Sequence, residues 1–277
     1  MTTSGVIAVP VDGGSIQVTI YSGALMPAIS LLCVHGWTLD QHSFDLQRVL
    51  AQREMVVATF DRRGFGASPL EPDFARELDD LSKVTRALPG RVIVYGVSQG
   101  ARLALRAAAL GSIAPAGLIL QGGHLDGYVC EELPEETIPF DHYRACFASG
   151  EVEAFQNHWG AHPLIAAGFG EAESRNLQGY FSHYRGLDLL TPNALPTPMD
   201  LQHRVRELGI PIMTVVGSLE TRARRAHAAE IERLTGAHRL IVEGGGHLCH
   251  LSHPDRVNAG VLDWCAGVSA RAGDGVE

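Results

Sequence analysis

A serine set between two glycines is the residue of this sequence best placed to do covalent chemistry. Gly96, Ser98 and Gly100 form the spacing G-x-S-x-G, after a β-branched apolar run and before an Ala/Leu/Arg-rich run. These runs predict a buried parallel strand and a helix. A strand, a tight glycine-flanked turn and a helix form a nucleophile elbow, in which a strained serine lifts its hydroxyl clear of the sheet. A serine that only caps the helix would fit the same position, and the strand before it favours the elbow.

A serine hydroxyl becomes a good nucleophile only when a base takes its proton and a third group orients that base. The candidate base is His247, which follows the last expected strand and a run of glycines. The candidate acid is Glu220, which follows Gly217 at the end of the preceding expected strand. One helix and one strand fit between them, so both side chains can meet above one edge of the sheet. Asp126, just after the expected strand 117–121, is the rival acid.

Other roles compete for these side chains. Glu220 could lie in the first turn of a helix, where the dipole favours a carboxylate, or pair with arginines that follow it. Those arginines are Arg222, Arg224 and Arg225. A metal site is the alternative around His247, with Cys249, His250 and His253 as its neighbours in sequence. No second cluster with zinc-like spacing accompanies them, so the sequence predicts no metal and no cofactor.

Composition and charge exclude several classes of function. The chain has 277 residues, 45% hydrophobic and 19% charged, which fits a globular protein with one large core. A net charge of −9 argues against nucleic acid and anionic membrane surfaces as partners. The five cysteines form no close pairs, and neither a signal peptide nor an apolar run of about 20 residues is visible. We therefore expect a cytoplasmic protein that acts on a small molecule, with its oligomeric state left open.

Strand-like and helix-like segments alternate along most of the chain. Two β-rich runs around Asp12-Gly13-Gly14 predict a hairpin, and later apolar runs each end in a loop before a helical pattern. The expected strands are 5–11, 15–21, 29–34, 55–60, 92–97, 117–121, 210–216 and 239–242, and the expected helices include 40–52, 222–234 and 255–266. This order predicts an α/β fold with one twisted, mostly parallel eight-stranded sheet and helices on both faces.

The alternation stops between residues 124 and 209, where prolines break several short helix-like runs. An insertion this long exceeds an ordinary loop, and it would sit at the carboxyl ends of the strands, where open α/β sheets bind ligands. We therefore expect a core domain of residues 1–123 and 210–277, with a helical lid of residues 124–209 inserted after the sixth strand and lying over Ser98.

More than half of the aromatic residues of the chain fall within this expected lid. Large side chains could build a small core for the lid itself, and some of them could line an apolar substrate pocket. The residues expected to contact substrate are Trp37, Tyr128, Phe147, Trp159, Tyr184 and Leu248.

Taken together in order and spacing, these motifs resemble the α/β-hydrolase family across nearly the whole chain. Besides the elbow, they are His35-Gly36-Trp37, Asp61 to Ser68, Gly217 to Glu220 and Gly246-His247-Leu248. The resemblance implies a triad in the chain order Ser98, Glu220, His247, although members usually carry aspartate where Glu220 stands. It also places one oxyanion N–H donor on Trp37. The helix N-terminus after Ser98 supplies the other donor, the backbone N–H of Gln99.

This combination predicts a serine hydrolase that cleaves a carboxylic ester or lactone of a small, largely apolar molecule through an acyl-enzyme. Residues 35–37 and the Asp61 to Ser68 loop resemble esterases and cofactor-free haloperoxidases. Arg102 and Trp159 also resemble the 2-succinyl-6-hydroxy-2,4-cyclohexadiene-1-carboxylate synthases, although Gly160 stands where an aromatic residue is expected. The alternative function is therefore a triad-dependent elimination or carbon–carbon cleavage. A non-catalytic ligand-binding module is a third, and the intact Ser98 and His247 argue against it.

Overall fold

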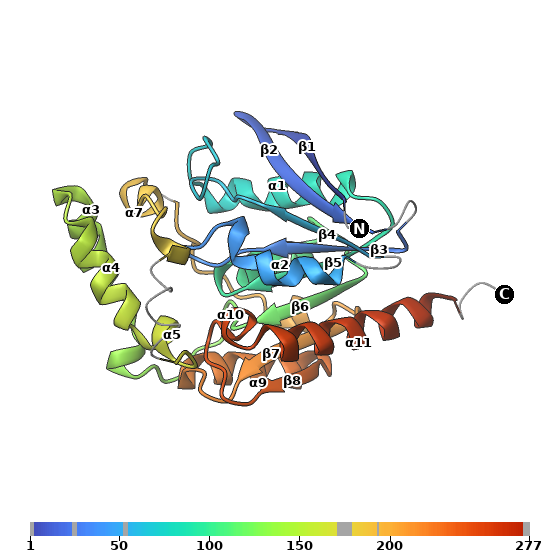
Figure 1. Ribbon diagram of the computed structural model, residues 1–277. Coiled ribbons are helices and arrows are strands. Elements are labelled where there is room, and N and C mark those ends of the chain that lie inside the picture. Colours follow the sequence, from blue (N-terminus) through green and yellow to red (C-terminus); the bar gives the residue numbers. More distant parts are fainter. Residues whose placement is uncertain (1–2, 24–26, 52–54, 171–178, 193, 274–277) are drawn as a thin grey trace.

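Eight strands of the described chain form one sheet in the order β1-β2-β4-β3-β5-β6-β7-β8 (Figure 1). The structure is a computed structural model, and it describes residues 3–23, 27–51, 55–170, 179–192 and 194–273. The strands are β1 (Thr3–Val11), β2 (Gly14–Ser22), β3 (Ile29–Val34), β4 (Met55–Phe60), β5 (Arg91–Val97), β6 (Gly117–Gln121), β7 (Ile212–Gly217) and β8 (His238–Val242). β2 pairs antiparallel with β1 and β4, and the remaining neighbours are parallel. The predicted eight-stranded, mostly parallel sheet is therefore confirmed.

The central strands are buried on both faces of the sheet. Every residue of β3 and β4 is buried. Leu31 and Cys33 of β3 contribute to one hydrophobic core, and Leu32 and Val34 contribute to the other. Successive side chains of a strand point to opposite faces, so a strand covered on both faces needs apolar residues throughout. This requirement explains why continuous apolar runs marked the central strands.

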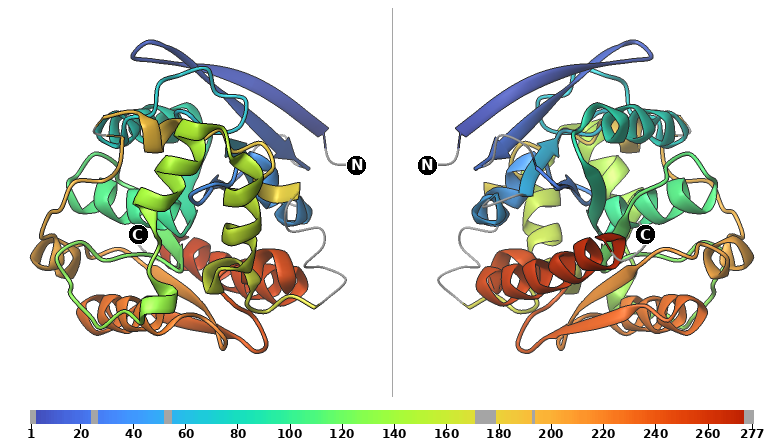
Figure 2. Two further views of the ribbon diagram at one scale, coloured as in Figure 1. Left: turned by 90° about the vertical axis from the view of Figure 1, so that its left-hand side faces the viewer. Right: turned by 90° about the vertical axis from the view of Figure 1, so that its right-hand side faces the viewer.

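Helices cover both faces of this sheet, as Figure 2 shows. On one face lie α1 (Phe74–Ala87), α2 (Gln99–Ala109), α8 (Gln202–Arg206) and α9 (Arg222–Thr235). On the other lie η1 (Gln41–Leu50), α10 (Cys249–Ser252) and α11 (Pro254–Gly273). None of the described helices is long and apolar enough to cross a bilayer.

Two of these helices differ from the sequence prediction. The segment expected as an amphipathic helix over 40–52 is a 3₁₀ helix, η1, in which the Ser43 N–H and hydroxyl both bond to the Asp40 carbonyl. The last helix, expected to end at residue 266, continues to residue 273. Val268 is still buried in the core there, and this packing outweighs the helix-breaking tendency of Gly267.

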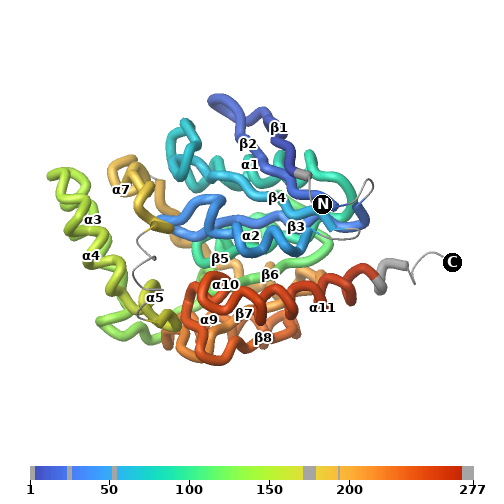
Figure 3. The backbone as a smooth tube through the Cα atoms, viewed as in Figure 1, coloured from blue at the N-terminus to red at the C-terminus, as the bar shows by residue number. Residues whose placement is uncertain are grey.

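The segment between β6 and β7 contains α3 (Phe140–Ser149) and α4 (Val152–Ala161), which lie beyond the carboxyl ends of the strands (Figures 1 and 3). Its shorter helices are η2 (Pro134–Glu136), α5 (Pro163–Ala166), α7 (Leu187–Leu190) and α8. Tyr143 of α3 and Phe155 of α4 belong to the hydrophobic core on the face of the sheet that η1 covers. Val205 of α8 belongs to the core on the opposite face, which α2 covers. The division into residues 1–123 with 210–277 and a lid of 124–209 stays a prediction.

Candidate active site

Ser98 occupies a strained turn between β5 and α2. Its backbone has φ 55° and ψ −115°, in the region that L residues rarely adopt, and its N–H donates to the Gln121 carbonyl at 2.7 Å. A Cβ on Gly96 would lie 2.5 Å from Ala101 Cα, and one on Gly100 would lie 2.1 Å from the Val34 carbonyl oxygen. The turn therefore excludes side chains at both glycine positions, as a nucleophile elbow requires.

The structure brings His247 and Glu220 together above the carboxyl edge of the sheet. His247 Nδ1 lies 2.7 Å from Glu220 Oε2, and both side chains are buried. Because a carboxylate can only accept, Nδ1 donates a proton in this hydrogen bond, and Nε2 is the ring nitrogen left to act as a base. Nε2 is buried without a hydrogen-bond partner among the described residues. The ring is thus oriented by Glu220 and holds a free basic nitrogen.

The surroundings of Glu220 keep it ionised. Burial would raise the pKa of this carboxyl, but the charge and hydrogen bond of His247, the Thr221 N–H and the charge of Arg224 together lower that pKa below its ordinary value. The Thr221 N–H donates to Oε1 at 2.7 Å, so each carboxylate oxygen has its own donor. An ionised carboxylate is what can hold the His247 tautomer and stabilise the imidazolium.

Asp126, the rival acid, lies among arginines of α2. Arg102 Nε donates to its Oδ1 at 2.8 Å, and Arg106 Nε donates to its Oδ2 at 2.7 Å. The structure therefore brings Glu220, and not Asp126, to His247.

The loop after β3 packs directly against Ser98. A Cβ on Gly36 would lie 3.3 Å from Ser98 Cβ, which leaves no room for a larger residue to settle without a shift. His35 braces this loop, because its Nε2 accepts from the Arg62 N–H at 3.0 Å and its Nδ1 bonds to the Gly36 carbonyl at 2.9 Å. Burial and the Arg62 charge lower the pKa of His35 to about 3, so the ring stays neutral. Trp37 follows this braced pair, beside the elbow.

Side chains of the segment between β6 and β7 form hydrogen bonds to Trp37 and Thr38 in the loop after β3. Trp37 Nε1 donates to Asp188 Oδ2 at 2.7 Å, and the Tyr184 hydroxyl donates to Asp188 Oδ1 at 2.6 Å. Trp159 Nε1 donates to the Thr38 hydroxyl at 2.9 Å, and Thr38 has the unusual φ of 63° for a β-branched residue. Asp188 was missed by sequence reasoning, and its only local signal is a carboxylate within the apolar run Leu187–Leu190.

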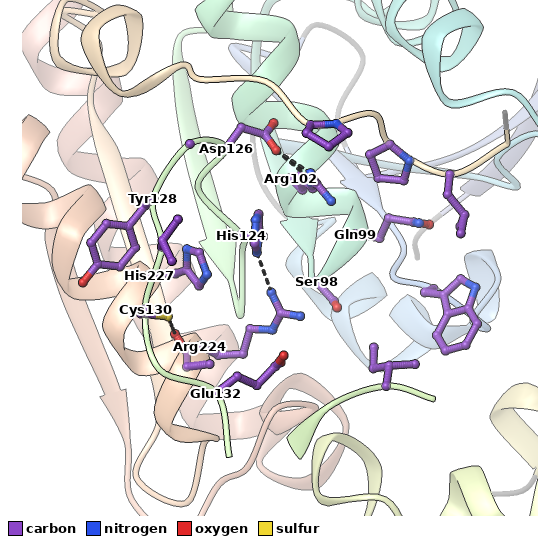
Figure 4. A pocket seen from close by; sticks show the side chains of 18 of the residues that line it. Ser98, Gln99, Arg102, His124, Asp126, Tyr128, Cys130, Glu132, Arg224 and His227 are labelled. Carbon is purple, nitrogen blue, oxygen red and sulfur yellow. Dashed lines mark hydrogen bonds and ion pairs between the residues drawn. The ribbon is translucent and has the colours of Figure 1, made fainter. Parts of the chain in front are cut away.

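A cavity of about 670 Å³ opens in front of Ser98 (Figure 4). Its polar wall comes from the elbow, from the chain after β6 and from α9. The charged and titratable residues on that wall are Arg102, His124, Asp126, Cys130, Glu132, Arg224 and His227. The apolar lining includes Trp37, Tyr128, Ile138, Phe140, Leu195 and Met199.

Only two of the six residues expected to contact substrate, Trp37 and Tyr128, line this cavity. The other four, Phe147, Trp159, Tyr184 and Leu248, are not among its lining residues, and their contact with substrate stays a prediction. Trp159, Tyr184 and Leu248 are buried in the core, and the ring centroid of Phe147 lies 4.8 Å from that of Phe155 and 5.3 Å from that of Tyr184. Aromatic contacts account for the positions of Phe147, Trp159 and Tyr184, the last two of which pack against Trp37.

The histidines and cysteine after β8 do not gather into a metal site. His250 Nδ1 lies 2.9 Å from Gln121 Nε2, and His253 Nδ1 lies 2.8 Å from the Ser252 hydroxyl. Across the described ranges, no group of three His, Cys, Asp or Glu residues could hold a metal ion.

Comparison with known proteins gives a family and a fold. Residues 31–259 match the model of the alpha/beta hydrolase family. The biotin biosynthesis bifunctional protein BioHC of Cellvibrio japonicus is 26% identical over 244 residues, which cover 84% of this chain and 47% of that protein. The chain thus spans about half the length of this curated relative.

Solved structures share the same architecture. MenH from S. aureus superposes with a TM-score of 0.77 at 18% identity, covering 91% of this chain and 98% of that one. A thermophilic esterase from Thermogutta terrifontis superposes with a TM-score of 0.74 at 20% identity, covering 96% and 99%. At these identities the likeness is one of fold.

Proposed function

The chain belongs to the alpha/beta hydrolase family, and on that premise we propose that it is a serine hydrolase that cleaves a carboxylic ester or lactone of a small, largely apolar molecule. The observation that carries the proposal is the buried His247–Glu220 pair, which leaves Nε2 free at the sheet edge where Ser98 stands on its strained turn. Such an arrangement supplies a nucleophile, a base and an orienting acid.

The proposed reaction proceeds in two halves. The Ser98 hydroxyl oxygen attacks the ester carbonyl while His247 Nε2 takes its proton, and the oxyanion is held by the Trp37 and Gln99 backbone N–H groups. The His247 imidazolium then gives that proton to the leaving alkoxide, which departs and leaves an acyl-Ser98. Water repeats the sequence on the acyl-enzyme, with His247 as base and then acid, and releases the carboxylic acid. Helices α3 and α4 act in this proposal as a lid over the cavity.

The direct test is turnover of p-nitrophenyl butyrate and γ-butyrolactone by the full chain. We expect saturable hydrolysis of at least one of them, since both present a small apolar acyl group. A folded protein that turns over neither contradicts the proposal. Turnover of a carboxylated cyclohexadiene instead would support elimination, and binding without any turnover would support a ligand-binding module.

Asp188 is a positioning residue in this proposal, because it holds Trp37 through the indole N–H. Asp188→Asn puts an amide N–H against one of two donors, Trp37 Nε1 or the Tyr184 hydroxyl, and loosens the loop. We expect kcat to fall roughly tenfold to a hundredfold with little change in KM, since an oxyanion donor acts mainly in the transition state. The control is Asp141→Asn on α3, whose carboxylate is exposed and pairs with Arg144. A change confined to KM or to Tm would contradict the positioning role.

Gly122 offers a test of the His247 position. It has φ +59°, and a Cβ there would lie 2.3 Å from His247 Cε1. Gly122→Ala should displace the ring and lower kcat/KM by about a hundredfold, the effect of a displacement of about 1 Å. Gly111→Ala is the matched control, because Gly111 also has a positive φ of +74° but nothing within 4 Å of its would-be Cβ. Equal losses of activity in both variants would show that backbone strain, and not His247, is responsible.

A further inference from the structure

One side of the cavity carries an arginine without an acidic partner. Arg224 reaches from α9 into the cavity, and Figure 4 shows its side chain extending toward Ser98 with His124 above it. Its Nη1 lies 3.2 Å from His124 Nδ1. Within the described ranges, no carboxylate lies within ion-pair distance of Arg224. Its neighbour Arg222, in contrast, pairs with Glu131 at 2.8 Å, outside the cavity.

Glu220, whose pKa the Arg224 charge helps to lower, is hydrogen-bonded to His247 and Thr221 and forms no ion pair with Arg224 among the described residues. The other charged groups nearby also leave Arg224 without an ion-pair partner. Asp126 is shared between Arg102 and Arg106, so these three groups together keep a positive charge. Glu132 lines the same cavity and forms no ion pair with Arg224 among the described residues. A partly buried guanidinium without an ion-pair partner gains a charge-assisted hydrogen bond when an anion binds beside it.

Two neutral histidines complete this wall. The rings of His124 and His227 lie 4.1 Å apart, and His227 Nδ1 accepts from the Leu125 N–H. Burial, together with the neighbouring positive groups, lowers the pKa of His124 to about 2 and that of His227 to about 4. Both rings therefore stay uncharged at neutral pH, and the positive charge of the wall comes from its arginines.

The cavity lining also includes the apolar residues Ile138, Phe140, Leu195 and Met199. The cavity thus joins apolar side chains to an arginine that has no ion-pair partner among the described residues and extends toward Ser98. We propose that it binds a substrate with an apolar body and a single carboxylate, which Arg224 holds beside His124 while Ser98 attacks the ester group. The carboxylate site is a binding claim of its own, and only the position of the ester rests on the proposed hydrolase function.

The kinetic test compares two esters of equal acyl chain length, p-nitrophenyl hydrogen glutarate and p-nitrophenyl valerate. The measured quantity is the ratio of their kcat/KM values within each variant, so that general damage to the site cancels. Arg224→Gln should lower the glutarate-to-valerate ratio by roughly tenfold to a hundredfold, the effect of one charge-assisted hydrogen bond. Arg224→Lys should lower it less, and Glu132→Gln should raise it.

Arg222→Gln is the matched control, because it removes the same charge from the same helix outside the cavity. Its ratio should equal that of the unaltered protein. An unchanged ratio in Arg224→Gln, or an equal fall in Arg222→Gln, would overturn the carboxylate site. The ratio should also stay constant from pH 6 to pH 8, because His124 and His227 remain neutral there. A fall of the ratio with rising pH would assign the charge to a histidine and overturn the role of Arg224.

A binding measurement separates this inference from the hydrolase proposal. Ser98→Ala protein is titrated by calorimetry with glutaric acid monoanilide and with neutral valeranilide, neither of which requires turnover. The monoanilide should bind at least about tenfold more tightly, and Arg224→Gln in the same background should remove the difference. If this result appears while no ester is hydrolysed, the carboxylate site stands and the hydrolase proposal fails. If esters are hydrolysed but neither test shows a carboxylate preference that depends on Arg224, the hydrolase proposal stands and the carboxylate site is rejected.

Discussion

Replacing Ser98 with alanine is expected to lower kcat for p-nitrophenyl esters by about 10⁴ to 10⁶, the scale seen when a triad nucleophile is removed. The reason is that the first bond to the acyl group can no longer form, while the cavity and the His247–Glu220 pair remain. The backbone at residue 98 keeps φ 55°, a strain that alanine shares with serine, so the variant should still fold. Far-ultraviolet circular dichroism and kcat under saturating substrate measure both parts of this prediction.

An organophosphonate should confirm the identity of the nucleophile. We expect one adduct per chain, on the peptide that contains Ser98, and none in Ser98→Ala. Ser149→Ala is the control, because Ser149 is an exposed serine at the end of α3 and should leave labelling intact. Labelling that persists in Ser98→Ala would reject the assignment.

Glu220→Gln is expected to lower kcat by about 10⁴, as the loss of the orienting carboxylate does in other serine triads. The amide can present an N–H to His247 Nδ1, which favours the wrong tautomer and places a proton on Nε2. Asp126→Asn should cost far less activity, although it leaves Arg102 and Arg106 with only a neutral partner and should lower the Tm. Both variants are compared under saturating substrate at a temperature where each is folded. A larger loss of kcat in Asp126→Asn would show that Asp126, after β6, is the orienting acid instead of Glu220.

The lowered pKa of Glu220 also predicts how stability changes with pH. Because the pKa is lower in the folded state, Glu220 stabilises the protein above its ordinary pKa of about 4.3. That contribution is lost as the pH falls through the lower folded-state value. The Tm of the unaltered protein should therefore fall more steeply than that of Glu220→Gln below about pH 4.3. Parallel Tm profiles would show that the folded state does not lower this pKa.

Local sequence was sufficient for the elbow and for the strands that position the site. The constraints there fix the residue type at single positions: a Cβ on Gly96 or Gly100 would lie less than 3 Å from backbone atoms, and β3 and β4 need apolar residues on both faces. Steric exclusion of this kind requires glycine, and burial on both faces requires apolar residues, so both constraints can be recognised from the residue types alone. Eight strands in one mostly parallel sheet could therefore be predicted without coordinates, whereas their order in the sheet was not.

Only the tertiary structure decided which side chains meet. Glu220 and Asp126 both follow strands, and the difference arises because two arginines of α2 take Asp126 and leave Glu220 to His247. Trp159 and Tyr184 were expected to contact substrate, and the structure buries them in the core, where both pack against Trp37. Arg224, which sequence offered as a partner of Glu220, bonds to His124 and faces the cavity. Such pairings join residues far apart in the chain, and they depend on packing that no local periodicity encodes.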